Sequence, residues 1–368
     1  MTRRVEIRAV AVSLSTSRVN RSYLEEVGTK LEEYSRNLPS ASGFEVRTRR
    51  LVLPFLEDLS RELGFSLERV AEEVCSVVEE LGGVDYVALP LRSAKGASWI
   101  IDVLKRYEKA FFSVPYVEGE EPLVEELVRG ISVKAGPVEA AHFAVSFGEQ
   151  LHTPYFPATA SKGDSTMLSL LYPSYLSSAI KEGKGMRAAL EELASKVVGA
   201  AKEVLKESGL PSRLGVDYSL SPWMEESAAA VIEDLKGTPL NMPGTHYAIL
   251  EINKAIWEVA ERYDGLGYNE VMLPVAEDDR LKELVAKGDL ALSQLVSYVS
   301  VCVAGLDMVL LPLSVEEGFI ASLVRDLAAI REVKGRTLGM RVILVDAEPG
   351  EVVELGFFGK TPVADPYG

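Results

Sequence analysis

The sequence predicts a single α/β domain built on a large, mostly parallel sheet or barrel. Short apolar segments typical of buried strands alternate with amphipathic segments of helix length along the 368 residues. The composition, 47% hydrophobic and 26% charged, is that of a globular chain. No apolar run reaches about 18 residues, so we predict no membrane span. We expect one domain over 1–368, with a looser N-terminal half (1–150) and a motif-rich C-terminal half (151–363).

The predicted elements follow from the hydrophobic period and from the residues that end each segment. Alternation predicts the first strand at 5–14, and a period of three to four predicts a helix at 22–34 with Ser22 as its N-cap. Further strands are predicted at 44–53, 84–91, 110–117, 139–147, 214–220, 269–275, 300–312, and in a closing hairpin of 340–347 with 351–358. Further helices are predicted at 67–81, 99–109, 122–130, 183–208, 245–262, 279–286, 292–299 and 315–332. The total is about ten strands.

Charge and cysteine content exclude several classes of function. The net charge is −16, and an acidic surface repels phosphate backbones and anionic membranes, so neither nucleic acid nor a membrane is an expected partner. Cys75 and Cys302 lie far apart in sequence, which argues against a disulfide framework and for a cytoplasmic location. Five Asn and two Gln in the whole chain indicate a thermophilic source. The apolar content fits a homo-oligomer.

The stretch 300–312 is apolar on both sides of a small polar group and predicts a central, buried strand. Cys302 and Asp307 are five positions apart, so they face opposite sides unless Gly305 marks a bulge. Two interpretations stay open for each residue. Cys302 is either a small buried hydrophobe or a nucleophile, and Asp307 either accepts backbone hydrogen bonds or takes part in catalysis.

A second candidate site is the run Lys162, Gly163, Asp164 and Ser165, which precedes a helix expected from Thr166. Backbone N–H groups at a helix N-terminus, with a lysine beside them, would form an anion-binding loop. The glycine spacing is not that of a P-loop. The alternative is an ordinary loop that leads into a capped helix.

Four further residues follow predicted strands or open helices. Asp217 lies within a short apolar strand, and His246 lies in the first turn of the next helix, where the helix dipole favours neutral imidazole. Glu277 and Asp278 follow the strand at 269–275 and are candidate ligands for a divalent cation. The alternatives are an exposed strand position for Asp217, capping or packing for His246, and for Glu277 and Asp278 acids at a helix N-terminus that the helix dipole favours.

Several motifs resemble a known family, UPF0210, also called DUF711. They are Pro154–Ala158, Gly215–Pro222, Gly244–His246, Pro274–Asp278, Val301–Met308 and Gly359–Val363. The resemblance implies a ten-stranded α/β barrel similar to that of pyruvate formate-lyase-like glycyl radical enzymes. It also implies a small ACT-domain protein as a partner.

Radical chemistry is not expected, because the C-terminal stretch 355–360 lacks an Arg-Val-x-Gly-Tyr loop and the chain lacks paired finger-loop cysteines. The sequence instead predicts an enzyme that acts on a small anionic metabolite by acid–base or metal-assisted chemistry. Asp217, His246, Cys302 and Asp307 are its candidate catalytic groups. The alternative is a non-catalytic sensor or scaffold that binds a small metabolite and docks the ACT-domain partner.

Overall fold

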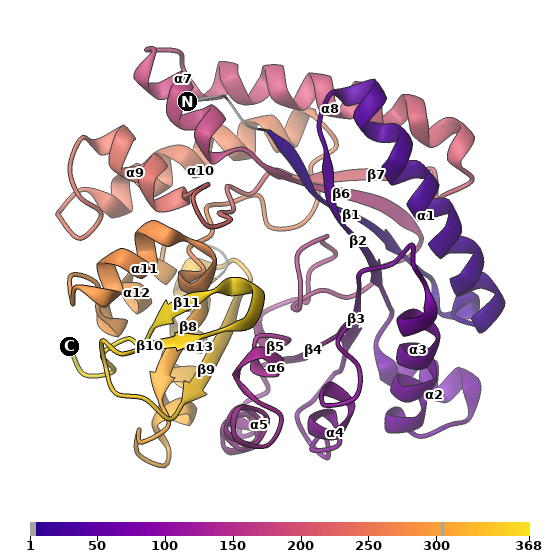
Figure 1. Cartoon of the computed structure of the whole chain (residues 1–368), viewed down its shortest axis with the longest axis horizontal. Helices are drawn as coiled ribbons and strands as arrows, with labels where there is room; N and C mark the ends of the chain where they lie inside the picture. Colours follow the sequence, from indigo (N-terminus) through magenta and orange to yellow (C-terminus); the bar gives the residue numbers. More distant parts are fainter. Residues whose placement is uncertain (1–4, 303–304) are drawn as a thin grey trace.

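The computed structural model describes residues 5–302 and 305–368 as a mixed α/β domain with strands around its centre and helices outside (Figure 1). The strands are β1 (Glu6–Ser13), β2 (Val46–Val52), β3 (Tyr86–Pro90), β4 (Ala110–Pro115), β5 (Phe143–Phe147), β6 (Ser165–Leu171), β7 (Leu214–Asp217), β8 (Leu306–Pro312), β9 (Leu338–Val345), β10 (Val352–Glu354) and β11 (Lys360–Pro362). The α-helices are α1 (Arg21–Ser42), α2 (Leu56–Leu63), α3 (Leu67–Glu80), α4 (Ile100–Leu104), α5 (Glu121–Lys134), α6 (Pro137–Ala140), α7 (Pro173–Lys181), α8 (Met186–Ser208), α9 (Ala228–Lys236), α10 (Thr245–Arg262), α11 (Asp279–Ala286), α12 (Leu292–Val299) and α13 (Phe319–Lys334). Three short 3-10 turns are η1 (Thr16–Arg18), η2 (Val275–Glu277) and η3 (Gly356–Phe358).

Nine of the described strands form one sheet in the order β7-β6-β1-β2-β3-β4-β5-β9-β8. Strands β1 to β5 are mutually parallel, whereas β6 and β9 run antiparallel to their neighbours β1 and β5. The sheet therefore has a central block of five parallel strands, flanked on one side by the parallel pair β6 and β7 and on the other by the parallel pair β8 and β9, and both pairs run opposite to the central block. Among the described residues, the segment predicted as a strand at 269–275 joins the sheet only through the single bridge of Val271 with Leu220, so it is not one of the nine strands.

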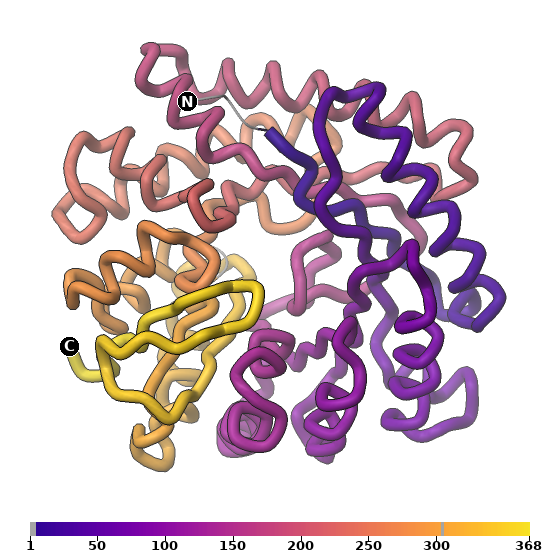
Figure 2. Tube along the Cα trace, viewed as in Figure 1, coloured from indigo at the N-terminus to yellow at the C-terminus, as the bar shows by residue number. Residues whose placement is uncertain are grey.

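The sheet is strongly curled. Strands β1 and β9 are five steps apart in the sheet order, which is about 24 Å along a flat sheet at about 4.8 Å per step. Nevertheless, Arg8 of β1 and Arg341 of β9 bind the same carboxylate, that of Glu277. The two strands must face each other across an interior, and the connection between β5 and β6 enters that interior (Figure 2).

Two predicted elements are wrong. Residues 165–171 form strand β6, antiparallel to β1, in place of a helix from Thr166. Leu168 and Leu170 pack in the main core, whereas Met167 packs with Ala11 and Val52 on the other face, so the segment alternates between two faces as a strand does. The closing hairpin is also different: β9 pairs in parallel with β8, and β10 pairs with β11.

The predicted central strand begins later than expected and, as β8, lies at the end of the sheet order and not in its middle. Strand β8 starts at Leu306, Cys302 precedes it, and Val303 and Ala304 lie outside the described residues. A register shift against β9 falls between Leu306 and Val309, so the bulge is in the strand, beyond Gly305. None of the described helices is both long and apolar enough to cross a membrane.

Gly305 is required by a close backbone approach. Its φ is +76°, and a Cβ there would collide with the carbonyl oxygen of Gly339 in β9. We expect Gly305→Ala to lower the free energy of unfolding by more than about 4 kcal/mol, because positive φ and a backbone clash add. Gly288→Ala is the control, since its φ is +72° but no atom lies within 4 Å of the added Cβ. That control should cost only about 1–2 kcal/mol in denaturant unfolding, and equal losses in the two variants would contradict the close approach.

Candidate functional site

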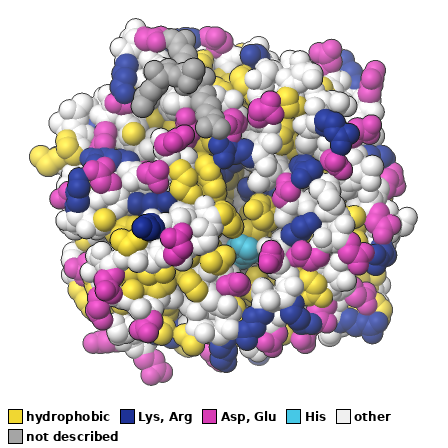
Figure 3. Space-filling model, viewed as in Figure 1, with side chains coloured by type: hydrophobic (Ala, Val, Ile, Leu, Met, Phe, Trp, Pro, Cys, Tyr) yellow, Lys and Arg dark blue, Asp and Glu magenta, His cyan; other side chains and the backbone are white. Residues whose placement is uncertain are grey.

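A cavity of about 390 Å³ lies inside the curled sheet. This volume is within the range of small-molecule sites, about 300–1,000 Å³. The face of the molecule drawn in Figure 3 has hydrophobic and basic side chains around a depression near its middle. Strands β1, β2, β3, β4, β5, β8 and β9 all contribute to the lining. The charged residues that line the cavity are Arg8, Arg47, Arg50, Glu277, Asp307 and Arg341.

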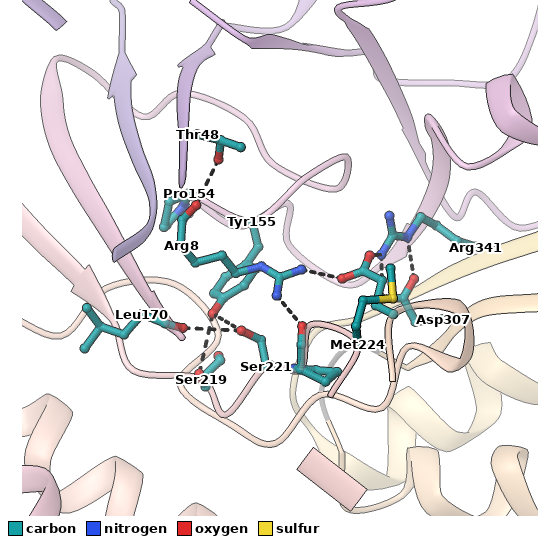
Figure 4. A network of polar contacts seen from close by, with 12 residues as sticks. Arg8, Thr48, Pro154, Tyr155, Leu170, Ser219, Ser221, Met224, Asp307 and Arg341 are labelled. Atoms are coloured by element: carbon teal, nitrogen blue, oxygen red, sulfur yellow. Dashed lines mark hydrogen bonds and ion pairs between the residues drawn. The ribbon is translucent and has the colours of Figure 1, made fainter. Parts of the chain in front are cut away.

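A chain of alternating charges crosses this interior (Figure 4). Arg8 binds Glu277 and also donates to the carbonyl of Pro222. The second oxygen of Glu277 accepts from Nη2 of Arg341 at 3.0 Å. Arg341 in turn binds Asp307 through two bonds, Nε–Oδ1 at 2.5 Å and Nη2–Oδ2 at 2.8 Å. All four side chains are at most 12% exposed, so water screens these charges weakly.

Two β-bulges orient the ends of this chain. Between Ile7 and Ala9 the pairing of β1 with β6 shifts register, and Arg8 is the extra residue. Between Leu306 and Val309 the pairing of β8 with β9 shifts in the same way, and Asp307 lies within that shift. Bulges re-aim side chains and are over-represented beside active sites. Both bulged residues line the cavity, so the irregular backbone directs charge toward it.

The carboxylates of the chain differ in how readily they take up a proton. Burial by itself would raise the pKa of Glu277, but Arg8 and Arg341 outweigh burial and the net shift is downward. Burial raises the pKa of Asp307, and the pair with Arg341 opposes that shift. Asp307 is therefore the carboxylate that protonates more easily as pH falls.

Arg50 of β2 is the exception to this charge balance. Its Nε donates to Oγ1 of Thr48 and its Nη1 donates to the carbonyl of Pro154, each at 3.0 Å. The guanidinium lies 5.1 Å from the ring centre of Phe156 and 5.8 Å from that of Tyr86. No described carboxylate forms an ion pair with it. Burial lowers the pKa of Arg50 to about 10, and the charge of Arg8 adds to the shift.

The cavity consequently carries an excess of positive charge. Arg47 pairs with Glu6. Arg8, Arg50 and Arg341 then face two carboxylates, those of Glu277 and Asp307, which leaves one uncompensated guanidinium among the described lining residues. This excess contrasts with the net charge of −16 for the whole chain.

Aromatic side chains form much of the wall and the rim. At the rim, Trp223 stacks on Phe357 with ring centres 6.2 Å apart, and Phe357 is 51% exposed. Phe357 and Phe358 belong to η3, the turn between β10 and β11. Nζ of Lys282, on α11, donates to the carbonyl of Phe358 at 2.9 Å and anchors this turn. The remaining aromatic lining residues are Tyr86, Phe111, Tyr155, Phe156 and Tyr268.

Of the residues predicted as functional, Asp307 and Glu277 line the cavity. Asp217 does not, but it positions the loops that do. It accepts five hydrogen bonds, from Oγ1 of Thr153, from the N–H and hydroxyl of Ser219, and from the N–H groups of Tyr268 and Asn269. Burial raises the pKa of Asp217 while these bonds oppose the shift. Its role in the structure is to hold the loops that carry Tyr155 and Tyr268.

His246 and Cys302 are placed away from the cavity lining. His246 is exposed at the start of α10, where its ring bonds Oγ of Ser297 at 3.0 Å. Cys302 is 1% exposed, and its carbonyl accepts from Nζ of Lys334 at 2.6 Å. Burial raises the pKa of the Cys302 thiol to about 12. Neither placement supports the predicted catalytic role, because one group lies on the outer surface and the other is a buried thiol.

The predicted anion-binding loop is wrong, because strand β6 takes the place of the helix that was expected from Thr166. Ser165 begins β6, and its hydroxyl bonds Nε2 of His152 at 2.7 Å. Oδ1 of Asp164 accepts from the N–H of Ser15 at 2.7 Å. Gly163 accepts from the hydroxyl of Ser13 at 2.5 Å, whereas Lys162 points to Glu149 on the surface. Without a helix N-terminus, the physical basis for anion binding at 162–165 is lost.

Glu277 and Asp278, the predicted ligands of a divalent cation, have different roles in the structure. Glu277 binds arginines in the cavity, whereas Asp278 is the N-cap of α11, accepting from the N–H groups of Arg280 and Leu281, and also binds Ser227. The alternative interpretation, an acid at a helix N-terminus, is therefore confirmed for Asp278. Within the described part of the chain there is no group of three or more His, Cys, Asp or Glu side chains placed to hold a metal ion.

The sequence interpretation missed the arginines Arg8, Arg50 and Arg341. Each lies in a strand that otherwise reads as apolar or mixed. A signal was present, since β2 contains three arginines in seven residues and strand interiors inside a barrel have room for long side chains. The sequence alone does not show which of those arginines faces inward. In the sheet, Arg49 pairs with Asp85, whereas Arg50 lines the cavity.

Breaking the charge chain should destabilise the fold. We expect Glu277→Gln to lower the free energy of unfolding by about 3–5 kcal/mol near neutral pH, because two buried guanidinium groups lose their carboxylate. The exposed Glu283→Gln variant should cost at most about 1 kcal/mol in the same denaturant experiment. Since the pKa of Glu277 is lowered in the folded state, its contribution is complete above the unfolded value near 4.3 and is lost as pH falls further. If the difference in the free energy of unfolding between the variant and the unaltered protein grew as the pH was lowered, this account would be contradicted.

Cys302 should be inert in the folded protein. A buried thiol with a raised pKa forms little thiolate, so we expect no alkylation by iodoacetamide at pH 8 under conditions that label the unfolded chain fully. The Cys75→Ala variant isolates Cys302, and mass spectrometry reads the label. Fast labelling of native Cys302 would restore it as a nucleophile candidate.

Comparison with known proteins places this site in a family. Residues 123–356 match the family model described as "Uncharacterised ACR (DUF711)". A UPF0210 protein of Pyrobaculum arsenaticum is 26% identical, with the match covering 99% of this chain and 90% of that protein. A UPF0210 protein of Lacticaseibacillus paracasei is 34% identical over 40% of this chain and 34% of its own length, so that match spans about a third of the relative. An anaerobic ribonucleotide reductase structure from Thermotoga maritima, with glycerol in its active site, aligns at 10% identity and a TM-score of 0.38, covering 97% of this chain and 77% of that one. The family match covers more than half of the chain, which therefore belongs to the DUF711 family.

Proposed function

We propose that this protein binds a small anionic metabolite inside the curled sheet, with Arg50 as the main contact for the anion. The observation that carries the proposal is the guanidinium of Arg50, which lines the cavity and forms no ion pair with a described carboxylate. An unpaired charge in a partly dehydrated site is costly, and a bound anion offsets that cost. The cavity volume and the aromatic walls suit a ligand of metabolite size.

Charge supports a ligand with one net negative charge. The lining has one excess guanidinium after its ion pairs are formed, so a monoanion neutralises it. Arg50 presents a planar fork held from behind by Thr48 and Pro154 and flanked by the rings of Tyr86 and Phe156. Such a preorganised guanidinium binds a carboxylate or phosphate more favourably than a flexible lysine.

The proposal is one of binding. Both carboxylates that line the cavity are already held by guanidinium groups, Glu277 by Arg8 and Arg341, and Asp307 by Arg341. Neither carboxylate is free to act as a general base until a ligand rearranges these ion pairs. This favours the sensor function over acid–base catalysis. Docking of an ACT-domain partner and homo-oligomer formation stay predictions from the sequence.

We also propose that the sheet is a variant of the ten-stranded barrel of glycyl radical enzymes. Its support is the topology of five parallel strands flanked by two parallel pairs of opposite direction, with the bridged segment at 265–271 parallel to β7 in the place of a further strand. Radical chemistry is not part of the proposal, because Cys75 and Cys302 are both absent from the residues that line the cavity.

The test is a comparison of Arg50→Met with Arg49→Met. The two arginines are neighbours in β2, but Arg49 pairs with Asp85 and is not among the residues that line the cavity. Calorimetry and thermal shifts would be measured with monocarboxylates, dicarboxylates, phosphate monoesters and their neutral amides. We expect anions alone to stabilise the protein, by about 2.7 kcal/mol at 100 times their Kd. Loss of a charged hydrogen bond should weaken binding by about 10-fold or more in Arg50→Met, with little change in Arg49→Met.

A second readout separates a binding role from a structural one. Because Arg50 is an unpaired charge, the ligand-free Arg50→Met variant should unfold at the same temperature as the unaltered protein or higher. A marked loss of stability without ligand, or equal affinity for the neutral amides, would contradict the proposal.

A further inference from the structure

A second arginine that lines the cavity, Arg341, also has a hydrogen-bond donor without a partner among the described residues. Arg341 uses Nε and Nη2 to bind Asp307 and Glu277, but no hydrogen bond involves its Nη1 among the described residues. Arg341 lines the cavity, and one guanidinium nitrogen points away from its two carboxylate partners (Figure 4). Arg50 likewise uses Nε and Nη1 and leaves its Nη2 without a partner in the described chain. Two guanidinium groups therefore offer free N–H donors to one cavity.

These two donors come from opposite walls. Arg50 is on β2 and Arg341 is on β9, and the strands between them in the sheet are β3, β4 and β5. Those three strands line the cavity with Tyr86, Phe111 and Ala144, one residue from each. A ligand that reaches from Arg50 to Arg341 therefore lies along a largely apolar floor.

The charge at the two ends is not the same. Arg50 has no carboxylate partner, so its end requires an anion. Arg341 binds Asp307 and shares Glu277 with Arg8, so two positive and two negative charges are paired at its end. A second anion there would face two carboxylates, and an ammonium group would face the donors of Arg341. An uncharged oxygen that accepts a hydrogen bond is the group that fits Nη1 without disturbing this balance.

We infer that the ligand is a bifunctional acid, with a carboxylate or phosphate at Arg50, a short apolar body over Tyr86, Phe111 and Ala144, and a neutral acceptor oxygen at Arg341. Hydroxy acids, oxo acids and acids with a terminal carboxamide belong to this class. The inference rests on the proposed function, because it takes Arg50 as the site of the anion. It adds the chemistry of the other end of the ligand.

The test is a series of straight-chain carboxylic acids of three to six carbons with a terminal methyl, hydroxyl, carboxamide, carboxylate or ammonium group. Affinities would be measured by calorimetry on the unaltered full chain. At the best length, we expect the hydroxyl and carboxamide acids to bind about 10-fold or more tightly than the methyl acid. The acids with a terminal carboxylate or ammonium group should show a smaller increase in affinity over the methyl acid than the hydroxyl and carboxamide acids. Equal affinities across the series, or tightest binding of the ammonium acid, would overturn the inference.

Variants then assign the two ends. Arg341→Lys should abolish the gain of the hydroxyl and carboxamide acids over the methyl acid, whereas Arg50→Met should weaken every acid in the series. If Arg341→Lys does not fold, the ranking on the unaltered protein still decides the question. Failure of all the acids to bind would refute the proposed function, whereas binding that depends on Arg50 but ignores the terminal group would refute this inference alone.

Discussion

The ion chain from Arg8 through Glu277 and Arg341 to Asp307 is the interaction on which the shape of the interior depends. Glu277 is held by guanidinium groups from strands five steps apart, so it joins two walls that the sheet order alone would separate. Buried ion pairs often add little net stability compared with apolar packing. Their value here is geometric, because removing the shared carboxylate would leave two like charges facing each other across the cavity.

The same chain explains how the rim is attached to the interior. Glu277 is followed by Asp278, which caps α11, and Lys282 of α11 holds the carbonyl of Phe358. On the other side, the backbone of Met224, next to Trp223, donates to the carbonyl of Glu277 at 2.6 Å. Both aromatic partners of the rim are therefore fixed to one short segment. A ligand that disturbed Glu277 would act on the rim through these backbone and cap contacts, and through Arg8, whose guanidinium lies 5.4 Å from the ring centre of Trp223.

Much of the fold could be predicted from the sequence, whereas most of the site could not. The alternation of strands and helices and the single domain follow from the hydrophobic period, but β8, predicted as the central strand, lies at the end of the sheet order. The side chains that converge depend on two bulges, at Arg8 and at Asp307, and the sequence analysis considered only a bulge near the second, at Gly305. In β1, Ile7 packs on the helices and so do Val10 and Val12, so the phase of the alternation changes at Arg8. Cys302 attracted a functional interpretation because it is a thiol within a predicted buried strand, but it is buried and does not line the cavity, so it is a packing residue.

The contrast between surface and interior bears on which anions can reach Arg50. A net charge of −16 repels large polyanions, but the field of exposed charges is screened within about 8 Å at physiological ionic strength. A small monoanion experiences that repulsion only briefly as it approaches the rim. Inside, the guanidinium of Arg50 acts in a region walled by Tyr86 and Phe156, where water competes less for its donors. The charge distribution therefore selects by size as well as by sign, because a polyanion remains in the repulsive field along most of its length, whereas a small acid loses it on entering the cavity.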